Sequence, residues 1–297
     1  MLKNFSLFKG IHYFCTQIMF CMKRLNLKAI GFSFIILLFT ACGEYNNILK
    51  STDLNVKFEY AKKYFDEGKY SRTATLLEDV VQMTRTTSRG EEALYLLAQS
   101  YYKMKDYSTA SEYFKTYFTT YPKGEYAELA RFYSAYGLYL DSPDPRLDQS
   151  DTYKAMQQFQ DFIELYPQSE RKDDAQNALF ELQEKLAEKE LMAVRLYYNL
   201  GNYSIVPFPG GNYLSCVITA QNAIRNYPYS KYREELMYYM FKSKYEMAIQ
   251  SVEEKKEFRY RDVIDEYFSY ANEFPEGKYI KEIRRLYESI DKRLKQE

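Results

Sequence analysis

The segment EEALYLLAQSYYKMKDYSTASEYFKTYFTTYP, residues 91–122, decides the fold. Its apolar side chains recur every three or four residues in two runs, the spacing that places them on one face of a helix. Tyr107 stands in the polar turn between the runs, and the small residues Ala98 and Ala110 allow a close helix–helix approach. The segment therefore predicts two antiparallel helices packed together. The other residues expected at their contact are Leu94, Leu97, Tyr101 and Phe114.

The same unit recurs along the chain, and an aromatic-proline pair marks its end. The chain reads YPKGEYAELA from residue 121, YPQSERKDDA from 166, YPYSKYREEL from 227 and FPEGKYIKEI from 274. Proline ends the preceding helix. The small residue two positions after each proline suits the N-cap of the next helix, whose first turns carry acidic residues. The expected N-caps are Gly124, Ser169, Ser230 and Gly277.

Residues 91–122 fit the tetratricopeptide repeat, a helix pair of about 34 residues. The register predicts an all-α tetratricopeptide-repeat superhelix of five helix pairs, closed by a capping helix over about residues 279–295. Five repeats are enough to bury a continuous core. Insertions are expected inside repeats three, four and five, at 141–151, 204–212 and 251–258. In the second of these, Ile205, Val206 and Phe208 stand among Pro and Gly, and they can pack locally or form an apolar docking loop.

Composition excludes several classes of function. The only histidine is His12, so residues 42–297 have no imidazole for a nucleophilic triad or a common zinc site. Residues 1–41 carry five basic and no acidic side chains, which leaves 36 basic against 41 acidic residues in 42–297, a net charge of −5. This balance is unsuited to nucleic acid. We therefore expect no catalysis, no cofactor, no metal and no nucleic-acid partner.

The N-terminal segment has the pattern of a leader. From Met22, the expected true start, a basic stretch is followed by the apolar run 29–39 and then by Thr40-Ala41-Cys42. This pattern is that of a secretory signal peptide, residues 1–41, too short to span a bilayer as a mature helix. The ending resembles a lipobox, which implies that the Cys42 sulfur carries a diacylglycerol. Residues 42–52 would then be a short polar lipidated tether.

At this point the chain resembles a known family, the BamD lipoproteins of the bacterial β-barrel assembly machinery. The resemblance is carried by Cys42, the five-repeat layout, DSPDPRLDQSDTYKAMQQFQDFIELYPQSE (141–170) and EKLAEKELMAVRLYY (184–198). It implies a scaffold on the periplasmic face of the outer membrane that holds the periplasmic domains of BamA and receives unfolded β-barrel clients. It further implies that repeats one to three, 53–170, bind clients and that 171–297 binds BamA.

The strict 37-residue period of repeats one to three makes the exposed positions of their first helices readable. Three registers, 37 residues apart, give candidate lining residues for a client groove. They are Phe58, Tyr95 and Phe132; Phe65, Tyr102 and Tyr139; and Lys62, Gln99 and Tyr136. Aromatic rings suit the apolar, aromatic-ended strands of barrel clients, and Lys62 could pair with a terminal carboxylate. The alternative is that these rings pack on neighbouring repeats.

Another envelope repeat lipoprotein, an adaptor related to peptidoglycan or glycan, is the competing interpretation. Glycan-binding repeat lipoproteins stack sugars on Trp, which this chain lacks. Peptidoglycan-related adaptors would lack the insertion at 141–151. Co-purification with a large β-barrel protein separates the two interpretations.

Overall fold

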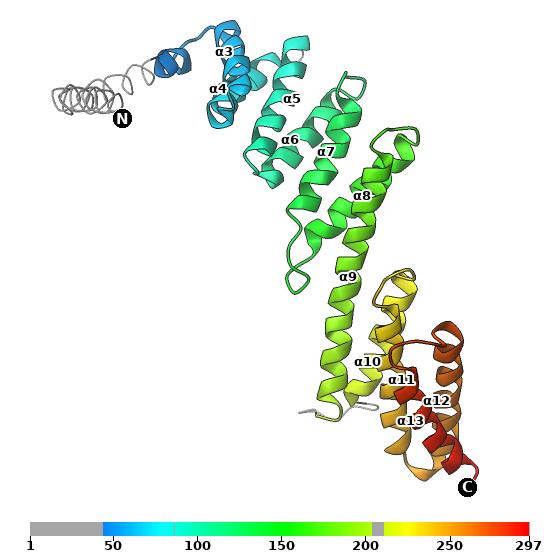
Figure 1. The fold of residues 1–297 in the computed structure, drawn as a ribbon. Coiled ribbons are helices and arrows are strands. Elements are labelled where there is room, and N and C mark those ends of the chain that lie inside the picture. The colour runs from blue at the N-terminus through cyan, green and yellow to red at the C-terminus, as the bar shows by residue number, and fades with distance from the viewer. Residues whose placement is uncertain (1–43, 86, 204–210, 297) are drawn as a thin grey trace, which may run out of the picture. The chain divides into compact units, whose positions relative to one another are not determined.

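The computed structural model describes residues 44–85, 87–203 and 211–296, drawn in colour in Figure 1. The expected signal peptide 1–41, Cys42 and residues 204–210 of the repeat-four insertion lie outside the described residues. The chain forms two compact units, unit 1 over Met1–Met104 and unit 2 over Lys105–Glu297. Each is described by itself.

Unit 1 contains three long helices, α3 (Leu54–Asp66), α4 (Tyr70–Thr84) and α5 (Ser88–Lys103). The middle helix, α4, packs against both of the others. Its apolar residues Leu76, Leu77 and Val80 are fully buried, as are Leu97 and Ala98 of α5. The helical periodicity of the sequence therefore becomes the core of this unit.

A short helix over residues 44–49 precedes α3 and belongs to the segment that the sequence suggested was a polar tether. Ile48 is buried, at 6% exposure, and the Tyr45 ring meets the Tyr64 ring of α3 edge-on at 5.9 Å between centroids. The backbone then turns, because Ser51 N donates to the Ile48 carbonyl at 3.0 Å. The side chain of Asp53 caps α3 by accepting from Asn55 N at 2.8 Å. We call residues 44–53 the strap.

Unit 2 is a run of eight helices, each packed against the next in sequence. They are α6 (Tyr107–Thr120), α7 (Ala127–Leu140), α8 (Ser150–Leu165), α9 (Lys172–Leu200), α10 (Gly211–Asn226), α11 (Arg233–Ile249), α12 (Glu253–Glu273) and α13 (Ile280–Leu294). All regular elements in the described ranges are helices. The all-α fold of helix pairs is confirmed, with α13 placed last as the expected capping helix.

The 29-residue helix α9 supplies side chains to two separate cores. Its first half contributes Ala175, Ala178 and Leu182 to the core that it shares with α7 and α8. Its second half contributes Leu191 and Val194 to the core built with α10 to α13. Figure 1 shows α9 running from one group of helices to the other within unit 2. The sequence did not reveal this bridging role.

The helices after each aromatic-proline pair begin two residues later than the sequence suggested. Their N-caps are Tyr126, Arg171, Tyr232 and Tyr279, and none of these caps through its side chain. The predicted capping residues stand instead inside a tight turn. In each turn the small residue's N–H donates to the preceding aromatic carbonyl, and its own carbonyl accepts from the first residue of the next helix, at 3.0–3.3 Å.

The insertions differ from one another. The loop of repeat three is ordered, because Lys189 Nζ of α9 donates to the Leu147 carbonyl at 3.0 Å and Gln149 Nε2 donates to the Asp144 carbonyl at 2.8 Å. The charged stretch 251–258, expected between helices, is mostly the start of α12 at Glu253. Ion pairs along that helix, such as Glu253 with Lys256 at 2.6 Å, support it. That expectation is corrected.

Candidate functional site

The predicted groove residues of unit 1 form one row on α3 and one on α5, each at spacing i, i+4, i+7. The two helices adjoin there, because Lys62 Nζ lies 3.2 Å from Glu92 Oε1. Phe58 is buried, at 3% exposure, beneath Lys62 and Arg89, whose charged groups lie 5.2 and 5.8 Å from its ring centroid. Phe58 therefore belongs to the floor of this face, and its ring is covered.

The remaining unit 1 candidates, Phe65, Tyr95, Gln99 and Tyr102, are half-buried. Gln99 Nε2 donates to the Tyr95 hydroxyl at 3.1 Å, which fixes both side chains along α5. Phe65 meets Tyr70 of α4 edge-on at 5.3 Å between ring centroids. These side chains are therefore neither fully exposed nor fully buried, and the client groove stays a prediction.

In unit 2 the three candidates form a row of adjacent aromatic rings on α7. The centroids of Phe132 and Tyr136 lie 5.3 Å apart, and those of Tyr136 and Tyr139 lie 5.2 Å apart. Phe132 is 3% exposed and touches Phe159 and Phe162 of α8, so it too belongs to the floor. Tyr136 and Tyr139 are half-buried and carry the open part of the row.

Tyrosine hydroxyls and carboxylates tie successive first helices together in unit 2. The Tyr139 hydroxyl of α7 donates to Glu181 of α9, and this hydrogen bond with partial burial raises the pKa of Tyr139 to about 12. The hydroxyl of Tyr232, the N-cap of α11, donates to Glu188 of α9 at 3.0 Å. These bonds hold one face of the array in a fixed register, with the Tyr136–Tyr139 row on it.

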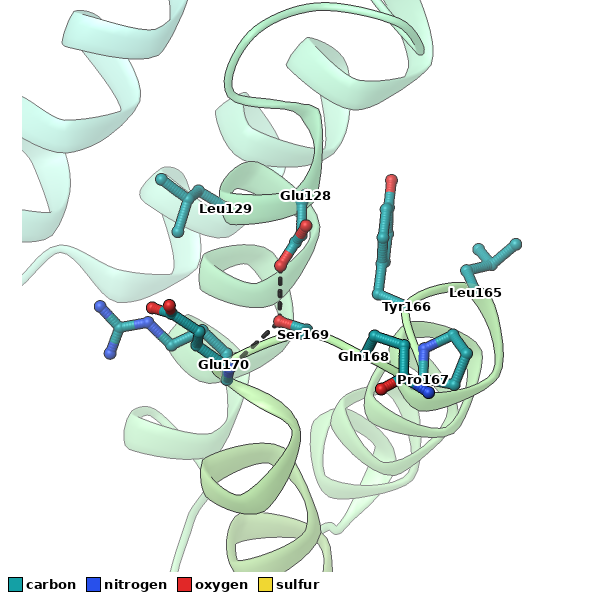
Figure 2. Close-up of a pocket in the computed structure, with 9 residues that line it drawn as sticks. Glu128, Leu129, Leu165, Tyr166, Pro167, Gln168, Ser169 and Glu170 are labelled. Atoms are coloured by element: carbon teal, nitrogen blue, oxygen red, sulfur yellow. Dashed lines mark hydrogen bonds between the residues drawn. The ribbon is translucent and has the colours of Figure 1, made fainter.

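An open hollow of about 690 Å³ lies beside α7, at the connection from α8 to α9. Its apolar wall comes from Leu129, Leu165, Tyr166 and Pro167. In Figure 2 the Ser169 hydroxyl points to Glu128, to which it donates at 2.5 Å. The same oxygen accepts from Arg171 N at 3.0 Å. The sequence did not predict this hollow, although the YPQS motif marks its wall.

The described residues contain no cluster of three potential metal-ligating side chains. In the same ranges no helix is both long and apolar enough to cross a membrane. Cys216 is fully buried, and burial raises the pKa of its thiol to about 11, which makes it a packing residue of α10 rather than a nucleophile.

Comparison with known proteins gives a family match and a distant structural similarity. The profile of the YfiO family, described as outer membrane lipoprotein, matches residues 51–206. No curated protein sequence matches the chain. A solved structure of a thermophilic tetratricopeptide-repeat protein from Thermus thermophilus aligns with 15% identity and a TM-score of 0.31, covering 80% of this chain and 98% of its own. Since the family match extends over more than half of the sequence, the chain belongs to the YfiO, or BamD, family of outer membrane lipoproteins.

Proposed function

We propose that the chain is a non-enzymatic scaffold of the β-barrel assembly machinery, acylated at Cys42 and held at the periplasmic face of the outer membrane. In this role it binds the periplasmic domains of BamA and unfolded β-barrel clients. The observation that carries the proposal is the family match over residues 51–206, which includes the ordered 141–149 loop and all of α9. The family is generally non-catalytic. The aromatic rows and exposed apolar side chains described below are the surfaces that we propose for binding.

Clients are assigned to residues 53–170 on the basis of the aromatic rows. Phe58 and Phe132 are buried. In unit 1 the partly exposed members are Phe65, Tyr95 and Tyr102, with Lys62 and Gln99 in the same rows. In unit 2 they are Tyr136 and Tyr139. A strand that ends in an aromatic residue would pack on such rings, and each aromatic contact adds about 0.5–1.5 kcal/mol beyond area burial. Lys62 keeps 42% of its side chain exposed and could meet a terminal carboxylate.

BamA is assigned to residues 171–297. Near the end of α9 the apolar side chains of Leu196 and Leu200 lie one helical turn apart and are 56% and 36% exposed. Large contiguous apolar patches mark many interaction surfaces, and these two leucines would contribute to one. They give the BamA assignment a place where it can be tested.

The first experiment is affinity capture of the tagged chain from detergent-solubilised outer membranes. The proposal predicts co-purification of a large β-barrel protein, and Leu196→Ser with Leu200→Ser should weaken it. Leu140→Ser with Leu165→Ser, two leucines outside 171–297 at 38% and 57% exposure, is the matched control. Capture of peptidoglycan enzymes or glycan instead of a barrel protein would favour the adaptor alternative and reject the proposal.

The client assignment needs its own measurement. Replacing Tyr95, Tyr102 and Tyr139 by Ser should weaken binding of a C-terminal client peptide at least tenfold, since three aromatic contacts at about 0.5–1.5 kcal/mol each are removed. The control carries Tyr153, Tyr203 and Tyr229 replaced by Ser, which are 55%, 73% and 87% exposed and stand outside the rows. Equal peptide affinity in the two folded triple variants would refute the groove.

A further inference from the structure

The strap leaves very little free chain between the expected anchor and the folded unit. Ile48 is buried, Ser51 closes the helical turn onto the Ile48 carbonyl, and Asp53 caps α3. Lys50 N also donates to the Asn46 carbonyl at 3.2 Å, and Asp53 N donates to Ser51 Oγ at 3.1 Å, so hydrogen bonds connect the short helix to the start of α3. Cys42 stands two residues before the short helix that starts at 44. Two residues of chain reach at most about 7 Å in any conformation.

The N-terminal end of the strap lies beside the turn that joins α3 to α4. Tyr45 contacts Tyr64 near the end of α3, and the Arg72 guanidinium of α4 lies 5.0 Å from the Tyr45 ring centroid. The turn is tight: Gly68 adopts a φ of +73°, and Lys69 N donates to the Tyr64 carbonyl at 2.8 Å. The chain thus leaves for Cys42 at the end of unit 1 that carries this turn.

Cations and tyrosine rings alternate around that turn. Lys63 Nζ lies 5.3 Å from the Tyr60 ring centroid, and Lys69 Nζ lies 5.4 Å from that of Tyr64. Lys69 also hydrogen-bonds Glu67 at 2.5 Å and, with Lys63 and Arg72, holds the pKa of that carboxyl below its usual range. Tyrosine with Lys or Arg is the combination that suits the headgroup layer of an anionic membrane.

We propose that unit 1 lies directly on the lipid leaflet that holds its anchor, with the α3–α4 turn against anionic phospholipid headgroups. The strap acts as a rigid mount, and Lys63, Lys69 and Arg72 contact lipid phosphates. The inference rests on the proposed acylation of Cys42. It adds an orientation: the Lys69 end of α4 faces the membrane, and the Thr84 end, about 22 Å away along a 15-residue helix, points away from it.

The orientation is tested with the lipidated full-length protein in vesicles that contain a headgroup-linked quencher. A fluorophore is attached at Ser71→Cys, exposed beside the turn, or at Met83→Cys, 73% exposed near the far end of α4. The buried Cys216 thiol is shielded from labelling. We expect strong quenching at position 71 and weak quenching at 83. Tyr45→Ala with Ile48→Ser, which releases the strap, should make the two positions alike.

The headgroup contact is tested by charge. Lys63→Gln with Lys69→Gln should lower the ratio of docked to undocked unit 1 about fivefold for each cation lost, in vesicles containing phosphatidylglycerol. Lys103→Gln with Lys115→Gln, the same charge change on exposed sites of α5 and α6, should leave quenching unchanged. Phosphatidylcholine vesicles should remove the difference between the two variants.

Flotation of the same samples separates the proposed acylation of Cys42 from the proposed orientation of unit 1. A wild-type protein that does not float lacks the anchor, which rejects the acylation and this inference together. A protein that floats but shows equal quenching at positions 71 and 83 keeps the anchor and overturns the rigid mount. Equal docking of the two double lysine variants overturns the headgroup contact.

Discussion

In the four aromatic-proline connections of unit 2, the backbone N–H of the N-cap residue is hydrogen-bonded in one of two ways. The backbone N–H of each N-cap residue must find an acceptor, because no carbonyl of its own helix can reach it. In the tyrosine junctions, α6–α7 and α12–α13, a tyrosine hydroxyl accepts it: Tyr117 from Tyr126 N at 3.1 Å and Tyr270 from Tyr279 N at 3.3 Å. In the serine junctions, α8–α9 and α10–α11, Ser169 and Ser230 accept it at 3.0 and 3.2 Å.

Each junction has either the accepting tyrosine or the accepting serine, and none of the four has both. Both tyrosine junctions have Gly two residues after the proline, while both serine junctions lack tyrosine four residues before the aromatic, where Phe162 and Ala223 stand. At Gly277 a Cβ would lie 2.8 Å from the Tyr270 hydroxyl and 2.5 Å from Glu234 Oε1. The tyrosine hydroxyl therefore occupies space that a serine would need.

In one junction of each type, the bridging hydroxyl also reaches the preceding repeat. Ser169 donates to Glu128 at 2.5 Å, and Tyr270 donates to Glu234 at 2.6 Å. Both glutamates stand in the first turn of a helix that follows an earlier junction, α7 or α11. One oxygen atom thus joins a helix start to the first turn of a neighbouring helix, whether a serine or a tyrosine supplies it. In these two junctions the hydroxyl has the same role although it comes from a different sequence position.

The largest effect is expected from forcing serine into a tyrosine junction. Gly277→Ser places a Cβ against Tyr270 and Glu234, and overpacking of this kind costs about 1–3 kcal/mol. The variant should lower the thermal midpoint by several degrees, measured by circular dichroism. Adding Tyr270→Phe removes one clashing atom and should restore part of the loss. A Gly277→Ser protein as stable as wild type would show that the two solutions are compatible after all.

Removing the tyrosine hydroxyl alone comes next in size. Tyr270→Phe leaves Tyr279 N and Glu234 without their shared partner in a partly buried site, a loss of about 1–2 kcal/mol. Tyr117→Phe should act in the same direction. Tyr229→Phe, 87% exposed in a serine junction, is the matched control and should be neutral in urea denaturation. Equal stability of Tyr270→Phe and the control would contradict the bridge.

The tyrosine arrangement can be transferred to the serine junction α8–α9. Ser169→Gly should destabilise by about 1 kcal/mol by removing the acceptor of Arg171 N. Adding Phe162→Tyr should recover part of this, because the ring at 162 lies 5.5 Å from Tyr166, much as Tyr270 lies 5.6 Å from Phe274. A double-mutant cycle measures the coupling. If Phe162→Tyr is equally costly in the wild-type background and in the Ser169→Gly background, the two residues do not exchange roles.

The sequence predicted the helix pairs because proline and periodic apolar residues act locally. It misplaced the helix starts by two residues, since it assigned capping to the small side chain while turn hydrogen bonds and a hydroxyl from another position do this work. It also placed Phe58 in an open groove. Periodicity assigns a face, but cannot show that Arg89 of the next repeat covers the ring. Contacts from other repeats are what the local pattern lacks.

The smallest expected effect separates the junction types by pH. Burial and the hydrogen bond to Glu234 raise the pKa of Tyr270 above the ordinary value of about 10. The unfolded chain therefore releases the proton first, so this stabilisation is complete below pH 10 and is lost as pH rises toward the folded pKa.

Tyr270→Phe should accordingly flatten the decline in unfolding free energy above pH 10, measured by urea denaturation at several alkaline pH values. Other tyrosines with raised pKa, such as Tyr139 and Tyr232, keep part of the slope. Ser230→Ala, which removes a serine hydroxyl that does not titrate in this pH range, should shift the whole curve down and leave its slope unchanged. A slope unaffected by Tyr270→Phe would mean that Tyr270 ionises alike in both states, and the tyrosine junction would then resemble the serine junction in alkali.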